Sequence, residues 1–264
     1  MIRVDDAISM ATAFQRLKRL LESPDVRELH EPEADVVQIE EFIPGNEYAI
    51  EAVLDHGELR VLAVFDKPDP LDGPFFEETI YVTPSRAGET VLRQIEQTVA
   101  AAAKALGLYH GPVHAECRVN DRGVYMLEVA ARPIGGLCAR ALRFEHQGAA
   151  IGFEEYLMRF ALGESMREWR RESRASAVMM IPIPRSGVYR RVDGVEEATR
   201  VPHVDGITIT AKPDQQLLAL PEGHSYLGFI FARADTPAAA DRAVREAHAR
   251  LRFTIDPLIP VAGA

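Results

Sequence analysis

Two glutamates, Glu116 and Glu128, stand in the middle of a segment that the sequence predicts to be a β-hairpin. The Asp-Arg-Gly turn between the strands suits a three-residue loop whose glycine is left-handed, and this register pairs Asn120 with Val124 and therefore Glu116 with Glu128. Like charges that face each other across a sheet destabilise it unless something compensates them. Carboxylate oxygens are preferred ligands of Mg²⁺, which takes its remaining ligands from water and substrate phosphates. We therefore expect Glu116 and Glu128 to bind a divalent cation.

The two faces of this hairpin differ in polarity, because side chains alternate along a strand. The apolar face is predicted to carry Val113, Ala115, Cys117, Val119, Tyr125, Leu127 and Val129. The other face is predicted to carry His114, Glu116, Arg118, Met126 and Glu128. The alternative to a metal site is a polar face in contact with solvent, on which Arg118 neutralises one glutamate. His114 could contact a substrate from this face, or it could be a hydrogen-bonded strand residue with no chemical role.

Arg132 follows Glu128 by four residues, at the predicted end of the strand and before Gly135 and Gly136. A guanidinium at this position could hold a carboxylate or a phosphate beside the metal ion. Backbone N–H groups of the two glycines could approach the same group closely. An ordinary surface arginine is the alternative.

A second pair of acids, Glu40 and Glu47, lies on either side of the turn Pro44-Gly45. A strand over residues 36–42 is predicted to lead into this turn. An ordinary hairpin is the simpler interpretation of these residues taken alone.

The elements that position these residues follow from hydrophobic spacing and from turn residues. Asp5 or Asp6 is predicted to cap a helix through Glu22, because apolar residues recur there at helical spacing. Further predicted elements are a hairpin over residues 47–55 and 58–66 about His56-Gly57, a strand over 78–82, a helix over 88–106 that ends at Gly107, and helical segments between the loop at 132–136 and residue 163.

Beyond residue 163 the pattern changes. The polar, Arg-rich stretch Glu164–Ser173 is typical of a linker, and short strands punctuated by turns are predicted after it. These strands cover residues 175–184, 187–192, 206–211, 216–220 and 226–234, and a helix over 237–251 follows them. We therefore predict a boundary near residue 170, between a domain over residues 1–170 and a β-rich domain over residues 171–264.

Composition excludes several classes of protein. Of the 264 residues 47% are hydrophobic, which is enough for a core, so the chain is not predicted to be disordered. A net charge of −10 argues against nucleic-acid binding, and two cysteines are too few for a disulfide framework. No apolar run is long enough to span a bilayer, so a cytoplasmic location is expected. Of the four lysines, only Lys67 is expected near the site.

Taken together, these motifs resemble the ATP-grasp superfamily of carboxylate–amine ligases. In that superfamily a strand ending Glu-x-x-(Leu/Ile) passes the adenine, and a glutamate four residues later binds the ribose. The resemblance places this pattern at Glu40, Ile43 and Glu47. It implies that Glu41 and Phe42, which lie on the same segment, also belong to the ATP-binding strand.

The same resemblance implies two Mg²⁺ ions between the ATP phosphates, held by Glu116 and Glu128, which are twelve residues apart; Mn²⁺ could replace them. The superfamily continues E-x-N-x-R after the second acid. Here Arg132 matches the arginine, while Ala130 replaces the asparagine and leaves the second ion one ligand short. Arg132 is the implied catalytic residue, which would stabilise the transferred phosphoryl group.

The stretches FDKPDPLDGPFFEETIYVTPS, HGPVHAE and EVAARPIGG are similar to those of the L-amino-acid ligase branch, in which the loop near Phe75, Phe76 and Glu78 lies toward the substrate. Further candidate substrate residues are His114, Gly135 and Gly136. The stretches AVMMIPIPRSGVYRRV and YLGFIFARADTP resemble the C-terminal domain of that branch. The implied fold class is α+β: an incomplete ATP-grasp fold, with an antiparallel sheet and flanking helices, followed by a smaller β-rich C-terminal domain.

The implied activity is ATP- and Mg²⁺-dependent ligation of a small-molecule carboxylate to an amine, such as an amino acid, through an acyl phosphate. The superfamily's lysine-bearing strands and Gly-rich loop are not found before the adenine strand. We therefore expect a C-terminal portion of such an enzyme, inactive alone, whose missing lobe a homo-oligomer or a partner chain could supply. The alternative is a non-catalytic ATP-grasp-like protein that binds a nucleotide or a subunit. The motifs do not name the carboxylate or the amine.

Overall fold

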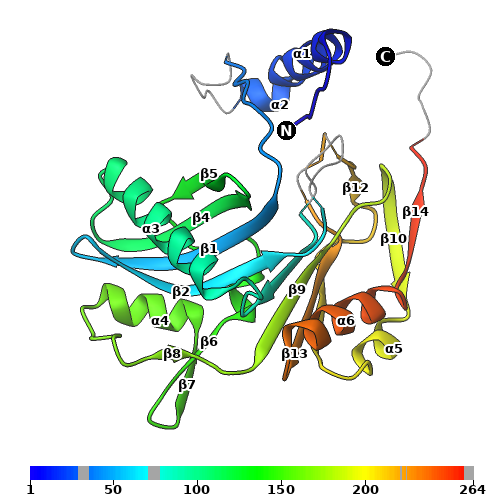
Figure 1. The fold of residues 1–264 in the computed structure, drawn as a ribbon. Coiled ribbons are helices and arrows are strands. Elements are labelled where there is room, and N and C mark those ends of the chain that lie inside the picture. The colour runs from blue at the N-terminus through cyan, green and yellow to red at the C-terminus, as the bar shows by residue number, and fades with distance from the viewer. Residues whose placement is uncertain (29–35, 71–77, 221, 224, 259–264) are drawn as a thin grey trace.

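The computed structural model describes residues 1–28, 36–70, 78–220, 222–223 and 225–258, and its main feature is an antiparallel sheet of eight strands (Figure 1). The strand order across this sheet is β11-β13-β9-β3-β2-β1-β4-β5. In chain order these strands are β1 (Asn46–Asp55), β2 (Glu58–Lys67), β3 (Ile80–Thr83), β4 (Gly111–Asn120), β5 (Gly123–Ala130), β9 (Ala175–Ile181), β11 (Val204–Ile209) and β13 (Gly228–Ala234). The predicted hairpin about His56-Gly57 is the β1–β2 pair.

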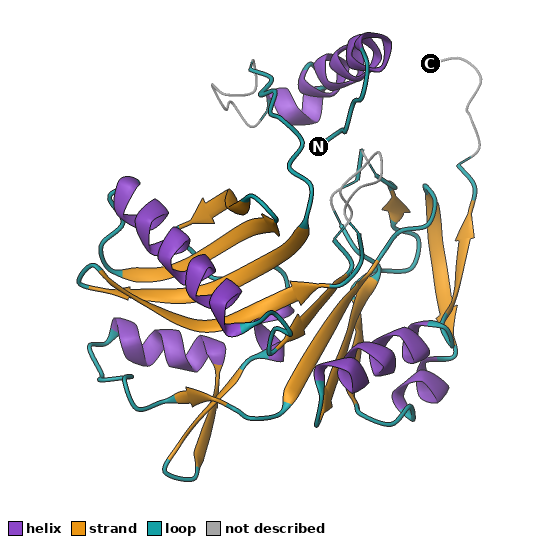
Figure 2. Ribbon diagram, viewed as in Figure 1, coloured by secondary structure: helices purple, strands orange, loops and turns teal. Residues whose placement is uncertain are grey.

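Two helices cover parts of this sheet (Figure 2). α3 (Glu89–Ala105) packs on β5 and β4, and it buries Ile95, Val99 and Ala103, whose spacing places them on one helical face. α6 (Pro237–His248) packs on β13 and β9. Both helices were predicted from their sequence patterns. Within the described residues, no helix is both long and apolar enough to cross a bilayer.

The N-terminal helices α1 (Ala7–Leu21) and α2 (Pro24–Arg27) lie apart from the sheet, at the top of Figure 1. The carboxylate of Asp6 accepts hydrogen bonds of 2.8 Å from the backbone N–H groups of Ile8 and Ser9. The predicted capped helix at the N-terminus is therefore confirmed.

Two sheets of three strands complete the fold, with the orders β12-β10-β14 and β7-β6-β8. Their strands and the remaining helices are η2 (Cys138–Ala141), β6 (Arg143–His146), β7 (Ala149–Gly152), α4 (Phe153–Ala161), β8 (Arg170–Arg171), β10 (Gly187–Asp193), α5 (Val195–Thr199), β12 (Gln216–Leu217) and β14 (Arg252–Asp256).

Two local predictions are wrong. Residues 36–42 form no strand, since these largely exposed residues have no neighbouring strand in the described part of the chain to complete their backbone hydrogen bonds. The helical region predicted after residue 136 is interrupted by the β6–β7 hairpin. Gln147 and Gly148 turn this hairpin with φ of 50° and 82°, the pair of positive values that a tight two-residue turn needs. In addition, α2, α5, β8 and β14 lie where the sequence predicts no helix or strand, and β8 lies inside the stretch predicted as a linker.

The large sheet runs across the predicted domain boundary near residue 170. β3 lies before the boundary and pairs with β9, which lies after it. One buried cluster contains Phe65 and Tyr81 from the first side and Val178 and Phe231 from the second. The two regions share a sheet and a buried cluster. The division into two domains at residue 170 therefore stays a prediction.

Candidate active site

Lys67 is buried at the centre of a group of three carboxylates. Its Nζ is 2.7 Å from an Oε1 atom of each of Glu47, Glu78 and Glu116, and its side chain is only 3% exposed. The carboxylates come from β1, from the segment before β3 and from β4. The structure thereby gathers three of the predicted site residues around the lysine that was expected near them.

Strand register explains how this group forms. Glu47 on β1 lies directly opposite Lys67 of β2 and directly opposite Arg118 of β4. Side chains that face each other across strands have Cβ atoms about 5 Å apart, so both cations reach the Glu47 carboxylate. Arg118 Nε donates to Glu47 Oε2 at 2.8 Å, and its Nη1 donates to the Ile43 carbonyl at 2.7 Å. Arg118 therefore contacts a glutamate on the neighbouring strand, Glu47.

A cavity of about 270 Å³ opens beside this group and is lined in part by Arg3, Phe42, Glu47, Lys67 and Arg118. The Cζ atoms of Arg3 and Arg118 lie 4.2 and 5.0 Å from the centre of the Phe42 ring. These cation–π contacts fix an aromatic ring against the cationic end of the cavity.

The predicted ATP-binding residues before β1 differ in whether they line this cavity. Phe42 lines the cavity, and the Ile43 carbonyl is bound to Arg118. Glu40 and Glu41 are exposed and do not line the cavity. Contact of these residues with a nucleotide stays a prediction.

The charges of Lys67 and Glu116 are set by their surroundings. Burial alone would lower the pKa of Lys67, but the charges of Glu78, Glu116 and Glu47 outweigh it and raise that pKa above its ordinary value. Burial alone would raise the pKa of Glu116, but the hydrogen bond from His114 and the charge of Lys67 lower it to about 2. Both groups are therefore charged at neutral pH.

His114 lies behind Glu116 and is 5% exposed. Its Nδ1 is 2.5 Å from Glu51 Oε1, and its Nε2 is 3.5 Å from Glu116 Oε1. Burial lowers the pKa of His114, yet its hydrogen bonds with Glu116 and Glu51 outweigh burial and raise the pKa to about 9. The ring is thus an imidazolium that bridges two glutamates, as expected of a hydrogen-bonded strand residue. Its contact with a substrate stays a prediction.

The predicted pairing of Glu116 with Glu128 is confirmed, but through a different register. Asn120 lies opposite Gly123 and not opposite the residue after it. A β-bulge at Leu127 then adds one residue to β5 and restores the pairing of the two glutamates. The predicted partners are correct, but the predicted turn register is wrong. The compensating bulge could not be predicted, because the sequence around Leu127 has no feature that marks a bulge.

The bulge also corrects the predicted faces of the hairpin. Met126 lies opposite Cys117 on the apolar face, and Tyr125 lies opposite Arg118 on the polar face. Leu127, predicted on the apolar face, is 42% exposed. Each of the three residues was misplaced by the same one-residue shift.

Glu128 and Arg132 lie at the open side of the hairpin, with side chains 54% and 53% exposed. Arg132 Nη2 donates to Glu128 Oε1 at 3.3 Å. Glu128 does not belong to the carboxylates gathered around Lys67. Glu116 and Glu128 each retain an oxygen, Oε2, that has no hydrogen-bond partner among the described residues. Two such oxygens on facing strands are donors that fit a divalent cation.

The remaining predicted substrate residues differ in their surroundings. Glu78 is 33% exposed, and its Oε2 accepts a hydrogen bond of 2.7 Å from the Tyr81 hydroxyl. Gly136 has φ of +61°, and a Cβ there would lie 3.3 Å from the Phe229 ring, whereas Gly135 faces open space. Phe75 and Phe76 lie outside the described residues.

Sequence reasoning assigns no site role to Tyr81, which contacts Glu78 and Glu116, or to Glu51, which contacts His114. The sequence could have indicated Glu51, because an acid inside the apolar run of a strand is unusual. In the structure Glu51 is fully buried. The sequence gives no such indication for Tyr81, since a tyrosine in a short strand is common.

Comparison with known families decides the relationship of this chain. Residues 1–141 match the family described as ATP-grasp domain, and residues 179–256 match the L-amino acid ligase C-terminal domain 2. The chain belongs to the ATP-grasp family. The resemblance to this family and to its L-amino-acid ligase branch is confirmed, and so is the α+β class with a partial ATP-grasp fold.

Three relatives show how far this ATP-grasp likeness extends. The L-amino acid ligase of Bacillus licheniformis is 27% identical with a TM-score of 0.79, over 97% of this chain and 62% of that one. An uncharacterized protein of Sinorhizobium fredii is 23% identical over 84% of this chain and 45% of its own length. The biotin carboxylase domain of the Hydrogenobacter thermophilus 2-oxoglutarate carboxylase, solved with MgADP, ADP and bicarbonate, is 16% identical with a TM-score of 0.55, over 80% of this chain and 46% of that one; it shows the fold alone. The chain thus spans less than two thirds of the length of each of these relatives.

Proposed function

We propose that this chain carries the metal-binding and phosphate-facing part of an ATP- and Mg²⁺-dependent carboxylate–amine ligase that acts on amino acids. Membership of the ATP-grasp family and the match to an L-amino acid ligase domain support a C–N ligase. The observation that carries the proposal is the carboxylate group around the buried Lys67, one member of which, Glu116, faces Glu128 across the hairpin.

In this proposal, ATP transfers its terminal phosphoryl group to a substrate carboxylate to give ADP and an acyl phosphate. An amine then attacks the acyl carbon, the bond from that carbon to the phosphate oxygen breaks, and phosphate leaves with the proton that the amine loses. Glu116 and Glu128 would hold Mg²⁺ through their free oxygens. When bound, Mg²⁺ neutralises charge on the ATP phosphates and on the group in transfer.

The chain's own residues would position the reactants. Lys67 holds Glu47, Glu78 and Glu116 in fixed places, so these carboxylates need little reorganisation during the reaction. Arg132 has a half-exposed guanidinium, which would contact the phosphoryl group in transfer. Phe42, Ile43 and Glu47, with the exposed Glu40 and Glu41 before them, would form the adenosine side of the site.

His114 would act on Glu116 and not as a general base. Its pKa of about 9 keeps the ring protonated at neutral pH, and both ring nitrogens face carboxylates. The imidazolium would keep the Glu116 carboxylate ionised and oriented toward the metal ion.

Nucleotide binding by the isolated chain tests the first half of this proposal. Calorimetry should show ATP binding that requires Mg²⁺, and Glu116→Gln should weaken it about tenfold or more, since one charged ligand is lost. Lys104→Met, which removes an exposed charge on α3, is the matched control and should bind like the wild type. Absence of Mg²⁺-dependent binding would contradict the proposed site.

Turnover tests the second half. We expect no phosphate release from the isolated chain with ATP, Mg²⁺ and pairs of amino acids, because it spans 62% of the L-amino acid ligase that it resembles. A chimera in which this chain replaces the matching region of the Bacillus licheniformis enzyme should release phosphate, and hydroxylamine should trap the acyl phosphate as a hydroxamate. Glu128→Gln in the chimera should abolish both signals.

A second candidate is a non-catalytic nucleotide-binding protein. The observation that favours it is Ala130, which stands where the superfamily motif has a metal-binding asparagine. A chimera that binds MgATP but releases no phosphate with any amino-acid pair would favour this candidate.

A further inference from the structure

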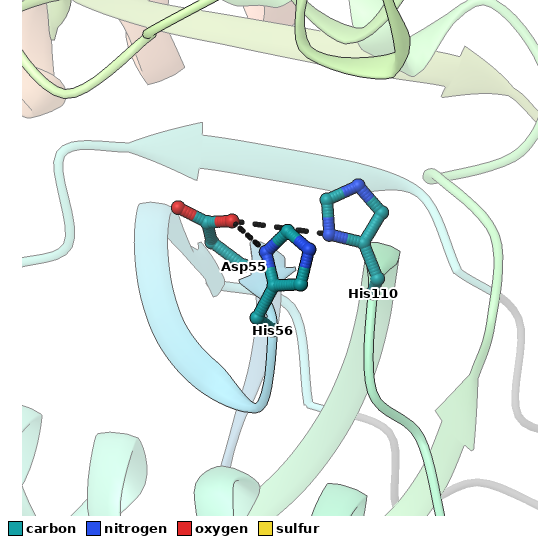
Figure 3. Close-up of side chains that lie close together, drawn as sticks. All are labelled: Asp55, His56 and His110. Carbon is teal, nitrogen blue, oxygen red and sulfur yellow. Dashed lines mark hydrogen bonds and ion pairs between the residues drawn. The ribbon is translucent and has the colours of Figure 1, made fainter. Parts of the chain in front are cut away.

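A second group of potential metal ligands lies at the opposite end of β1 from Glu47. Asp55 and His56 come from the β1–β2 turn, and His110 directly precedes β4 (Figure 3). One ligand atom from each of the three side chains lies within 4.8 Å of the others. Glu47 and Asp55 are eight residues apart on one strand, which is a separation of about 27 Å. This group is therefore remote from the candidate active site.

Both imidazoles turn the same nitrogen toward one carboxylate oxygen. His56 Nδ1 is 2.7 Å from Asp55 Oδ1, and His110 Nδ1 is 3.9 Å from that same atom. A tetrahedral Zn²⁺ site with bonds of about 2 Å separates its ligand atoms by about 3.3 Å. The two observed separations lie on either side of this value, and the ligand atoms of all three side chains lie within 4.8 Å of one another, so small side-chain shifts would seat an ion.

The surrounding structure holds the two histidines in place. The Gly57 N–H donates to the Tyr109 carbonyl at 2.7 Å and ties the turn to the segment before β4. The His56 ring makes an edge contact with Tyr109, at 5.7 Å between centroids, and the His110 ring stacks on Phe160 at 4.8 Å. These contacts keep the two rings close to Asp55.

The backbone of His56 is also unusual. Its φ is 52°, a left-handed value that few residues other than glycine adopt. His56 is the first residue of the two-residue turn His56-Gly57, where asparagine or glycine would adopt this conformation at lower cost. The turn nevertheless carries a histidine, whose ring this conformation directs toward Asp55 and His110.

The site opens onto a cavity of about 770 Å³, which Asp55, His56, His110 and Glu58 help to line. A fourth coordination position would therefore be accessible to water or to a small ligand. A neighbouring cation, Arg167, lies 3.6 Å from Asp55 Oδ2 and 3.4 Å from Glu58 Oε2, so two carboxylates already balance its charge. Oδ1 of Asp55 remains directed at the histidines.

We propose that Asp55, His56 and His110 form a site for a transition-metal ion such as Zn²⁺ or Co²⁺. Two imidazoles and one carboxylate suit these ions, whereas Mg²⁺ prefers a set of oxygen ligands. This site is therefore distinct in chemistry and in place from the carboxylates of the candidate active site. A bound ion would join the β1–β2 turn to the segment before β4.

Titration with Co²⁺ in excess Mg²⁺ tests the proposal without any measurement of activity. The wild-type chain should bind one Co²⁺ with the visible absorption of a four-coordinate ion, and Zn²⁺ should remove this absorption. His56→Asn and His110→Gln should each weaken Co²⁺ binding by about tenfold or more. Asn is chosen at position 56 because it tolerates a positive φ.

His203→Asn is the matched control, since His203 is also an exposed histidine with positive φ, of 73°, on a turn far along the chain. It should bind Co²⁺ as the wild type does. The side chain of His56 is 70% exposed and that of His110 is 41% exposed, so the metal-free variants should unfold within a few degrees of the wild type. Asp55→Asn, which removes the third ligand, should weaken binding as well. The proposal would be overturned if the wild type bound no Co²⁺ in excess Mg²⁺. It would also be overturned if the site variants bound Co²⁺ as well as His203→Asn does.

Discussion

The ammonium group of Lys67 is a single cation that contacts all three carboxylates of the group, Glu47, Glu78 and Glu116. Each of its hydrogen bonds joins a different segment of the chain, so one side chain ties β1, β4 and the segment before β3 together. A buried lysine with one carboxylate would lose much of its interaction energy to desolvation. Three carboxylates outweigh that cost, and for this reason the pKa of Lys67 rises in spite of burial.

Lys67→Met should destabilise the chain because it leaves three carboxylates close together without their cation. Removal of one partner from a buried ion pair costs about 3–5 kcal/mol, and we expect a loss of this size at pH 7 in urea unfolding. The charge of Lys67 lowers the pKa of Glu116 in the wild type, so its loss and the repulsion from neighbouring carboxylates would raise the pKa of Glu116 in the variant. The variant should therefore gain stability relative to the wild type as the pH falls toward 4.

Lys104→Met serves as the control for this prediction as well, since it removes an exposed lysine from α3. Its unfolding free energy should differ from the wild type by no more than about 0.5 kcal/mol at any pH. Equal losses in the two variants, or a loss in Lys67→Met that ignores pH, would refute the role given to Lys67.

His114 should make the stability of the chain fall at alkaline pH. Its pKa is raised to about 9 in the folded state from an ordinary value near 6.5. A raised pKa means that its contribution is complete below pH 6.5 and is lost as the pH rises through about 9, with a total of up to about 3 kcal/mol. The difference in unfolding free energy between the wild type and His114→Gln should shrink over this range. A difference that stays constant from pH 6 to pH 10 would show that the imidazolium contributes nothing.

At the scale of elements, β1 is the strand on which the site depends. It lies between β2 and β4, which place Lys67 and Arg118 on either side of Glu47. The entry to β1 is fixed by Gly45, which has φ of +133° and passes against the backbone of β4. A Cβ at this position would lie 2.3 Å from the carbonyl oxygen of Val119.

Gly45→Ala should therefore displace the start of β1. The added methyl group meets backbone, which cannot rotate away, so we expect a loss of about 3–4 kcal/mol from strain and overlap together. Gly107→Ala isolates the strain alone, because Gly107 also has a positive φ, of +72°, but a Cβ there meets nothing within 4 Å. It should cost only about 1 kcal/mol. Equal losses in thermal or urea unfolding would mean that the close approach to Val119 does not matter.

At the scale of the whole molecule, the sequence predicted the positions of helices and strands better than it predicted which strands pair. Alternation and turn residues located the β1–β2 hairpin and α3 closely, because these signals are local. The strand expected over residues 36–42 failed, since a strand needs a neighbour that no local pattern supplies. The site shows the same division: the acids were found one by one, while the sharing of Lys67 among them depends on the register of three strands. The Leu127 bulge is likewise set by tertiary pairing.

The continuous sheet leads to a prediction about the whole chain. Residues 1–170 end before β9, and in a fragment of this length β3 would lose its four paired residues on that strand. The fragment would also lose Val178, Met180, Phe229 and Phe231 from the core that contains Phe65 and Tyr81. We expect the fragment to show no cooperative thermal transition by circular dichroism, whereas a chain of residues 1–258, which keeps every described element, should unfold like the full chain. The reason for this expectation is that strands from both sides of residue 170 form one sheet. A cooperative transition in the fragment would instead mean that the predicted boundary separates independent folding units and that β3–β9 pairing contributes little to stability.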